Sequence, residues 1–162
     1  MIRRVRPDDV DVFRDVRLRA LADAPSAFVS TYAAEVARPR ADWVDRTSRA
    51  AAGNDLAVFL AFDGSDCVGL AGGKHDDLGA DRQLISMWVA PSHRGTAVAT
   101  ALVEAVVDWA RAEGCSSIGL WVTRGNDRAL RFYERMGFTV TGDVQPLPSD
   151  PCKDELRMLR RL

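Results

Sequence analysis

The sequence of 162 residues contains little cysteine, little histidine and no long apolar run, and each absence narrows the protein classes that it can encode. Its cysteines, Cys67, Cys115 and Cys152, form neither a CxxC pair nor a Cys/His ligand set, which argues against a disulfide framework and against a bound metal. No segment has the length and apolarity of a membrane span, and the charged N-terminal residues do not form a signal peptide. We therefore expect a cytoplasmic protein with no membrane partner.

The charges of the chain are nearly balanced. Its 22 Lys and Arg residues against 23 Asp and Glu residues give a formal net charge of −1, so the total charge does not favour nucleic acid as a partner. Apolar residues make up 47% of the chain, which is enough to bury a core at this length. We expect one domain that spans residues 1–162.

Apolar periodicity predicts short strands that alternate with helices. Asp8, after Pro7, is predicted to cap a first helix that ends near Pro25, and Gly114 is predicted to close a long helix that begins after Gly95. Residues 145–152 contain three prolines and are expected to form a loop. The expected strands are residues 2–6, 56–62, 67–73, 84–89, 117–123, 139–144 and 155–162, and the further helical regions are residues 27–36, 42–52 and 126–136.

The most informative segment is WVAPSHRGTAVAT, residues 88–100. An apolar run ends near Val89, and Pro91 follows, which cannot continue a ladder of strand hydrogen bonds. In the next helix, the first N–H groups have no internal partner and lie at the positive end of the helix dipole, while small residues let an anion approach the backbone. Arg94 adds a positive charge beside them. The segment therefore predicts an anion site, of the kind that binds phosphate.

Two motifs that follow one another along the chain resemble motifs of the GNAT family of N-acetyltransferases. RGTAVATAL, residues 94–102, is similar to the family's pyrophosphate-binding motif (Q/R)xxGx(G/A), and VTRGNDRALRFYERMGF, residues 122–138, is similar to its second cofactor segment. A weaker similarity extends over nearly the whole chain. The resemblance implies an α+β fold in three layers, with a mixed, mostly antiparallel seven-stranded sheet, a splayed central parallel pair and helices on both faces.

The resemblance also implies a reaction, the transfer of an acetyl group from acetyl-CoA to a primary amine of a small molecule or peptide by direct attack in a ternary complex. It implies that the Val89 N–H faces the thioester carbonyl and that Tyr133 donates a hydrogen bond or a proton to the coenzyme sulfur. Tyr133 could also be a core residue, and Asn126 could be only a helix cap. The residues implied to contact acetyl-CoA are Met87, Trp88, Val89, Arg94, Gly95, Thr96, Ala97, Val98, Ala99, Thr100, Asn126 and Tyr133.

The chain departs from the family's pattern at two positions. Ala97 replaces the middle glycine of the pyrophosphate motif and puts a methyl group where the backbone should approach phosphate most closely, although we still expect acetyl-CoA to bind. Gln83 stands about where many relatives have a glutamate base, and a glutamine cannot take a proton. The acceptor site is expected near Phe28, Glu35 and His75, and the candidates for a replacement base, directly or through water, are Glu35, His75, Asp76 and Asp77.

Two other functions remain open from the sequence. Ala97 and Gln83 favour a non-catalytic acyl-CoA-binding or sensor module of the same fold, which would bind acetyl-CoA without turnover. A protein that binds nucleotide phosphates at the same helix end would let ATP compete with acetyl-CoA. The resemblance also implies a homodimer, because family members often pair through their C-terminal strands, but the sequence shows no pattern that marks such an interface.

Overall fold

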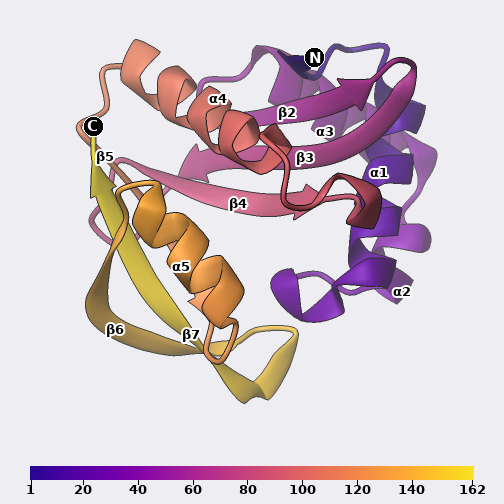
Figure 1. Cartoon of the computed structure of the whole chain (residues 1–162). Helices are drawn as coiled ribbons and strands as arrows, with labels where there is room; N and C mark the ends of the chain where they lie inside the picture. Colours follow the sequence, from indigo (N-terminus) through magenta and orange to yellow (C-terminus); the bar gives the residue numbers. More distant parts are fainter.

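The computed structural model describes all 162 residues, and seven of its elements are strands of a single sheet (Figure 1). Along the chain the elements are β1 (Ile2–Arg4), α1 (Val10–Asp23), η1 (Pro25–Ala27), α2 (Tyr32–Val36), α3 (Arg40–Ala52), β2 (Leu56–Asp63), β3 (Asp66–His75), β4 (Arg82–Val89), η2 (Pro91–His93), α4 (Val98–Ala112), β5 (Ser117–Thr123), α5 (Asp127–Arg135), β6 (Thr139–Leu147) and β7 (Asp150–Arg161). No helix combines the length and the apolar character that crossing a membrane requires.

The sheet has the strand order β1-β2-β3-β4-β5-β7-β6. Only β4 and β5 run parallel, and they pair only near their starts, Arg82 with Ile118 and Gln83 with Gly119. Beyond these two pairs the strands diverge, while every other neighbouring pair is antiparallel. The expected fold, a mixed and mostly antiparallel sheet with a splayed central pair, is therefore confirmed.

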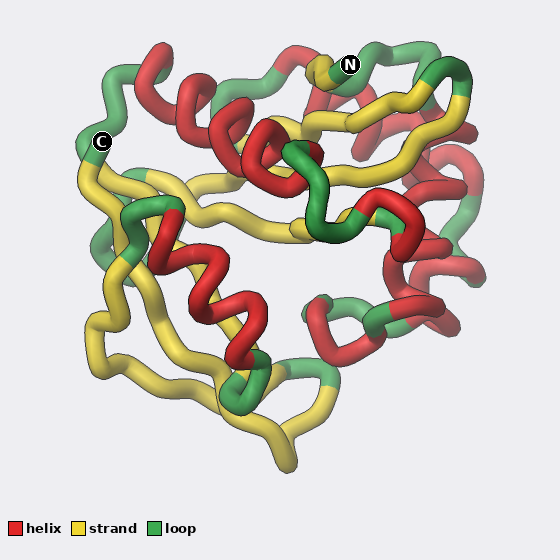
Figure 2. The backbone as a smooth tube through the Cα atoms, viewed as in Figure 1, coloured by secondary structure: helices red, strands yellow, loops and turns green.

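Helices cover both faces of the sheet (Figures 1 and 2). Helix α4 packs on β2, β3 and β4, and α1 and α3 pack on β3 and β2 from the other side. The apolar side of α4, which includes Leu102, Val106 and Trp109, is buried, and it lies so close to β3 that a Cβ on Gly73 would come within 2.5 Å of the Trp109 ring. Gly73 and Leu84, paired across β3 and β4, therefore face α4, and the next pair, Lys74 and Gln83, faces α1 and α3.

Three sequence predictions of local structure need correction. The residue before the first helix is Asp9, not Asp8, because the Asp9 carboxylate accepts hydrogen bonds from Arg3 and from the Arg6 N–H and fixes the entry to α1. Residues 28–31 are not helical, because the chain is extended at Phe28 and Thr31 between η1 and α2.

The third correction concerns residues 145–152, which form the end of a hairpin and not a loop. Strand β6 continues to Leu147 and β7 starts at Asp150, so that Leu147 pairs with Asp150. Pro146 is tolerated because β6 is the outer strand of the sheet, where a missing N–H need not interrupt a ladder. The hairpin end contacts residues before α2, since the Ser149 hydroxyl donates to the Phe28 carbonyl at 2.7 Å.

Candidate functional site

A cavity of about 540 Å³ lies where β4 and β5 part. Because the strands diverge, the cavity is lined from both faces of the sheet. On the α5 face it is lined by Leu84, Leu120, Val122, Asn126, Ala129 and Tyr133, and on the α1 face its lining includes Arg17, Phe28, Arg46, Lys74, Asp76, Gln83, Trp121, Thr123, Gln145 and Glu155. Two reactants could therefore enter from opposite faces and meet between the strands.

A β-bulge shapes the β4 side of this cavity. The β3–β4 register shifts between the Leu70–Trp88 and Gly72–Ile85 pairs, and Ser86 has a φ of 56°, the only positive value at a residue other than glycine. The Ser86 hydroxyl accepts a hydrogen bond of 2.7 Å from Arg17 Nη1. Ser86 and Met87 both line the cavity, so the bulge turns this stretch of β4 towards the opening.

The backbone of Val89 points away from β3. Gly69 and Val89 are directly opposite each other in the two strands. The hydrogen bond to β3 is made by the next residue, because Ala90 N donates to Val68 O at 2.8 Å. The N–H and C=O of Val89 therefore face the parted side, where the carbonyl accepts from Arg94 Nε at 3.1 Å. The Val89 N–H therefore points in the direction that the family resemblance implies. Whether this N–H contacts a thioester carbonyl stays a prediction.

The segment before α4 offers a set of free backbone donors. The amides of Gly95, Thr96, Ala97, Ala99 and Thr100 have no hydrogen-bond acceptor in the chain, and that of Val98 reaches only the Thr96 hydroxyl, at 3.3 Å. Gly95 has a φ of 82°, which a side chain would strain. The geometry fits the anion site that the sequence predicts for this segment.

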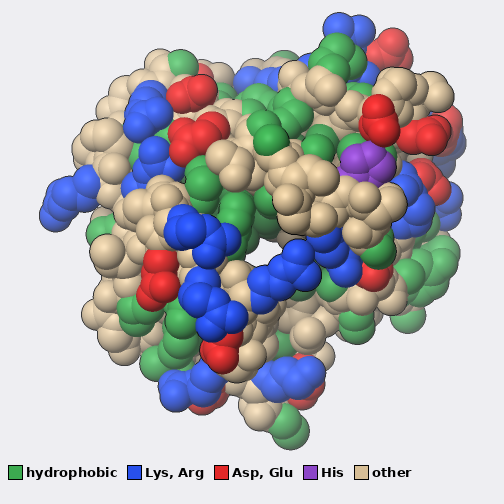
Figure 3. Space-filling view, viewed as in Figure 1, with side chains coloured by type: hydrophobic (Ala, Val, Ile, Leu, Met, Phe, Trp, Pro, Cys, Tyr) green, Lys and Arg blue, Asp and Glu red, His purple; other side chains and the backbone are tan.

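Arg94 does not extend freely over these amides. Its guanidinium contacts the Asp23 carboxylate, which also accepts a hydrogen bond of 2.8 Å from Trp88 Nε1. Arg94 thus ties the loop to the end of α1. In Figure 3, Lys and Arg side chains gather around a hollow between α5 and the end of β4. The exposed arginines of α5 include Arg128 and Arg131, and the exposed Arg94 follows η2.

Tyr133 lies on the inner face of α5 with 9% of its surface exposed. Its ring packs against Phe138, with centroids 5.8 Å apart, and its hydroxyl makes no hydrogen bond within the chain although the residue lines the cavity. Burial raises the pKa of the Tyr133 hydroxyl, which therefore keeps its proton. Asn126 caps α5, as its Oδ1 accepts from Ala129 N at 3.2 Å, and it also lines the cavity, while its role in binding the cofactor stays a prediction.

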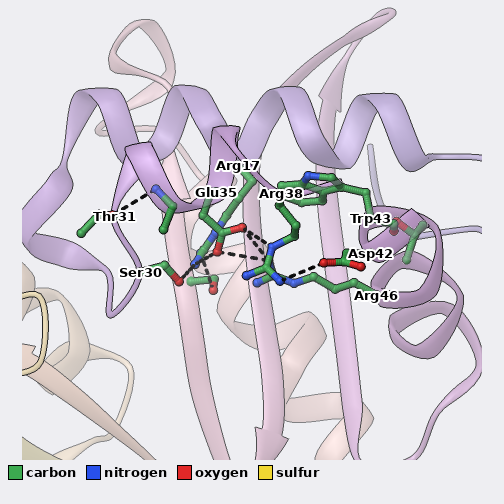
Figure 4. A network of polar contacts seen from close by, with 11 residues as sticks. Arg17, Ser30, Thr31, Glu35, Arg38, Asp42, Trp43 and Arg46 are labelled. Carbon is green, nitrogen blue, oxygen red and sulfur yellow. Dashed lines mark hydrogen bonds and ion pairs between the residues drawn. The ribbon is translucent and has the colours of Figure 1, made fainter. Parts of the chain in front are cut away.

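Of the residues predicted for the acceptor, Phe28 lines the cavity and the other two do not. His75 is exposed at the end of β3. Glu35 is completely buried and held by arginines (Figure 4): its carboxylate lies 3.0 Å from Arg46 Nη1, 3.2 Å from Arg38 Nε and 3.7 Å from Arg17 Nη2. Burial alone would favour the protonated carboxyl, but Arg46 and its neighbours lower the pKa of Glu35, which makes it a poor base.

Asp76 and Gln83 lie on the α1 face of the cavity, towards the closed end of the parted strands. Asp76 Oδ2 accepts hydrogen bonds from Arg157 Nη2 at 2.6 Å and from Ala80 N at 2.9 Å. Asp76 is thus engaged in a buried ion pair. Gln83 offers an amide in place of a carboxylate.

The sequence did not single out Glu155. It lies on β7 opposite Thr123, on the α1 face of the cavity, with 8% of its surface exposed. Gln145 donates a hydrogen bond of 3.0 Å to its Oε2, and no Lys, Arg or His pairs with it. Burial raises the pKa of Glu155, against a smaller lowering by Gln145. Its only sequence signal is alternation, because Glu155 and Arg157 put charges on one face of β7 while Leu156 and Met158 face the other.

Comparison with known proteins points to one family. The profile of the "Acetyltransferase (GNAT) family" matches residues 19–138. A mycothiol acetyltransferase of Propionibacterium freudenreichii is 29% identical over 154 residues, which cover 93% of this chain and 46% of the relative. A streptothricin acetyltransferase of Streptomyces lavendulae is 33% identical over 90 residues, covering 54% of this chain and 47% of the relative.

The fold agrees with this result. The structure of the PaiA N-acetyltransferase of Thermoplasma acidophilum in complex with coenzyme A superposes with a TM-score of 0.75 at 16% identity, covering 100% of this chain and 98% of that one. The chain spans less than half the length of the two curated relatives described above. The matched profile nevertheless covers most of the sequence, including both motifs and the parted strands. The chain belongs to the GNAT family of acetyltransferases.

Proposed function

We propose that this chain transfers an acetyl group from acetyl-CoA to a primary amine of a small molecule or peptide. The observation that carries the proposal is the cavity between β4 and β5, which joins the Tyr133 side of the sheet to the Glu155 side. The names of the mycothiol and streptothricin relatives and the coenzyme A complex of the PaiA protein support the same chemistry. The three free cysteines fit a reducing cytoplasm, and a homodimer stays a prediction.

The residues present fit acetyl-CoA as the donor. The free amides of residues 95–97, 99 and 100 would bind the pyrophosphate, and Ala97 need not block it, because it is exposed in helical geometry and its own N–H is free. The parted edges of β4 and β5 would hold the pantetheine arm by their unpaired backbone groups. When bound, acetyl-CoA supplies the reactive thioester.

The groups around the cavity match the needs of direct attack. The amine nitrogen attacks the thioester carbon, the carbon–sulfur bond breaks, and the acetyl group passes to nitrogen. The Val89 N–H would stabilise the oxyanion that develops, an interaction worth on the order of 3 kcal/mol in other enzymes. The proton lost by the amine would go to Glu155, directly or through water, and Tyr133 would donate a proton to the leaving thiolate and regain one from solvent.

The test is the release of coenzyme A thiol from acetyl-CoA across a panel of primary amines and peptides, with acetyl-CoA binding measured by calorimetry on the same protein. We expect binding below millimolar concentration and amine-dependent release. Binding without release from any amine would favour a non-catalytic acyl-CoA module, and competition of ATP with acetyl-CoA would favour a nucleotide-phosphate protein.

A further inference from the structure

Arg17 is a buried cation on the wall of the cavity that the proposed mechanism does not use. It lies on α1, on the stripe that also carries Phe13 and Leu21, with 4% of its surface exposed. Its guanidinium lies over the Phe28 ring, 4.6 Å from the centroid. Nη1 donates to Ser86 on the bulge, whereas Nε is buried without any partner. A buried donor of this kind is costly unless something binds it.

The ion pairs around Arg17 leave it incompletely neutralised (Figure 4). Three arginines, 17, 38 and 46, share the Glu35 carboxylate, and Arg17 is the most distant of them, at 3.7 Å. The only other carboxylate in the network, Asp42, is exposed and lies 3.9 Å from Arg38. Burial, and then the repulsion of Arg46, lowers the pKa of Arg17 to about 10. The cluster therefore has a surplus of about one positive charge, and two of its members, Arg17 and Arg46, line the cavity.

We infer that the acceptor carries a carboxylate besides its amine, and that Arg17, with Arg46, binds this carboxylate on the α1 wall of the cavity. The inference rests on the proposed acetyl transfer and names the substrate class for it. A singly charged carboxylate matches the surplus of the cluster, and it would supply the missing acceptor for Arg17 Nε.

The other charges of the cavity agree with a zwitterionic acceptor. Lys74 on β3 lines the same face and forms no ion pair, Asp76 is paired with Arg157, and Asp77 is exposed. Glu155 comes from the other part of the sheet, on β7, without a cationic partner. An acceptor that lies between α1 and β7 would thus place its carboxylate at Arg17 and its amine near Glu155, beside the gap through which the thioester is reached.

The first arm of the test measures binding alone, with probes that cannot be acetylated. Phenylacetate carries a carboxylate where 2-phenylethanol carries a hydroxymethyl group, and calorimetry gives the affinity of each compound for the intact protein. We expect phenylacetate to bind at least about tenfold more tightly. Arg17→Met should abolish the preference, and Arg17→Lys should retain part of it. Arg14→Met is the matched control, because Arg14 lies on the same helix, lines no part of the cavity and makes no ion pair.

The second arm measures turnover with matched pairs of amines, such as L-phenylalanine with phenethylamine and 4-aminobutyrate with propylamine. We expect the carboxylate-bearing member of a pair that turns over to have a kcat/KM at least about tenfold higher, and Arg17→Met to lose this ratio. A merely structural role for Arg17 would lower both members of a pair equally. If Arg17→Met does not fold, the carboxylate site is tested by the kcat/KM ratios of the wild-type protein and by the loss of these ratios in Arg46→Met.

The two arms separate the possible failures. Equal turnover of paired amines together with equal binding of the two probes would overturn the carboxylate site and leave acetyl transfer intact. A probe preference that survives in Arg17→Met would also overturn it. Carboxylate binding that depends on Arg17, without acetylation of any amine, would support the site and refute the proposed reaction.

Discussion

At the scale of single residues, the proposed chemistry depends on how burial changes the proton affinity of two side chains. Gln83 cannot accept a proton, and the carboxylates of Glu35 and Asp76 are held by arginines. Glu155 is the remaining carboxylate of the cavity that is both largely buried and free of a cation. Because burial disfavours its charged form, its pKa moves towards the range in which a base is useful.

Replacing Glu155 should separate activity from stability. Glu155→Gln keeps a hydrogen-bond partner for Gln145. The substitution should lower kcat/KM by roughly 10²-fold, and it should remove the increase of the rate with pH that the raised pKa of Glu155 causes in the wild type. A carboxyl whose folded pKa lies above its unfolded value stabilises the fold below the unfolded pKa, and this contribution is lost as pH rises through the folded pKa. Glu155→Gln should therefore raise the melting temperature at pH 7 relative to wild type, and raise it less at pH 4. Glu104→Gln, on α4 outside the cavity, is the control for activity; an unchanged pH–rate profile in Glu155→Gln would exclude Glu155 as the base.

Tyr133 should matter for catalysis and little for stability. Its hydroxyl has no hydrogen-bond partner in the chain, so Tyr133→Phe should change the free energy of unfolding by no more than about 0.5 kcal/mol. The same change should lower kcat by roughly 10²-fold if the hydroxyl protonates the thiolate. Steady-state kinetics and thermal unfolding give both values, with Tyr32→Phe, exposed and away from the cavity, as the matched control. Full activity in Tyr133→Phe would assign Tyr133 to the core alone.

Residues with a backbone or motif role were easier to predict than charges that depend on the tertiary fold. The positions of Val89, Asn126 and the amides after Arg94 follow from local patterns, a strand end, a helix cap and a helix start. Arg17 and Glu155 could not be found in this way, because α1 and β7 are brought to one cavity only by the folded sheet. A charge at an apolar helix position, as at Arg17, is the one signal that could have indicated a buried site.

At the scale of elements, the Asp76–Arg157 pair connects the two parts of the sheet. Asp76 belongs to the turn after β3, and Arg157 to β7, which lies beyond β5 in the strand order. Gly119 on β5 leaves room for this contact, because a Cβ there would come within 2.3 Å of Arg157 Nη2. The ion pair is buried, with 3% and 1% of the two side chains exposed. It lies towards the closed end of β4 and β5, where Asp76 lines the cavity.

Breaking this pair should be costly, because it leaves a buried charge without a partner. Asp76→Asn and Arg157→Met should each lower the free energy of unfolding by about 3–5 kcal/mol, and the double variant by clearly less than the sum. Urea unfolding of the four proteins gives the coupling energy. Asp108→Asn, in the exposed pair with Arg111, should stay within about 0.5 kcal/mol. Additive losses in the double variant would show that Asp76 and Arg157 contribute independently.

At the scale of the whole molecule, the chain forms two parts that touch weakly in the sheet. Strands β1–β4 form one part and β5–β7 the other, joined in the sheet by two residue pairs. Strand positions could be predicted from apolar runs and turn residues, because these patterns are local. The divergence of β4 and β5 came from the family resemblance and not from the residues. The prolines of residues 145–152 misled the prediction, because Pro146 is compatible with the edge position that β6 takes in the folded sheet.

Acetyl-CoA should bind across both parts, and hydrogen exchange can locate it. The donor is expected to occupy the free amides of residues 95–97, 99 and 100 and the facing edges of β4 and β5. Acetyl-CoA at a hundred times its Kd should stabilise the fold by about 2.7 kcal/mol, and it should slow exchange at these free amides, which are open to solvent in the unliganded protein. ATP at the same concentration is the control for binding by phosphate alone, and equal protection by both would favour a nucleotide-phosphate site. Protection confined to the apolar groove around Ile2, Phe62 and Ala101 would place the coenzyme outside the parted strands and would contradict the proposed mechanism, because Val89 and Tyr133 could then not reach the thioester.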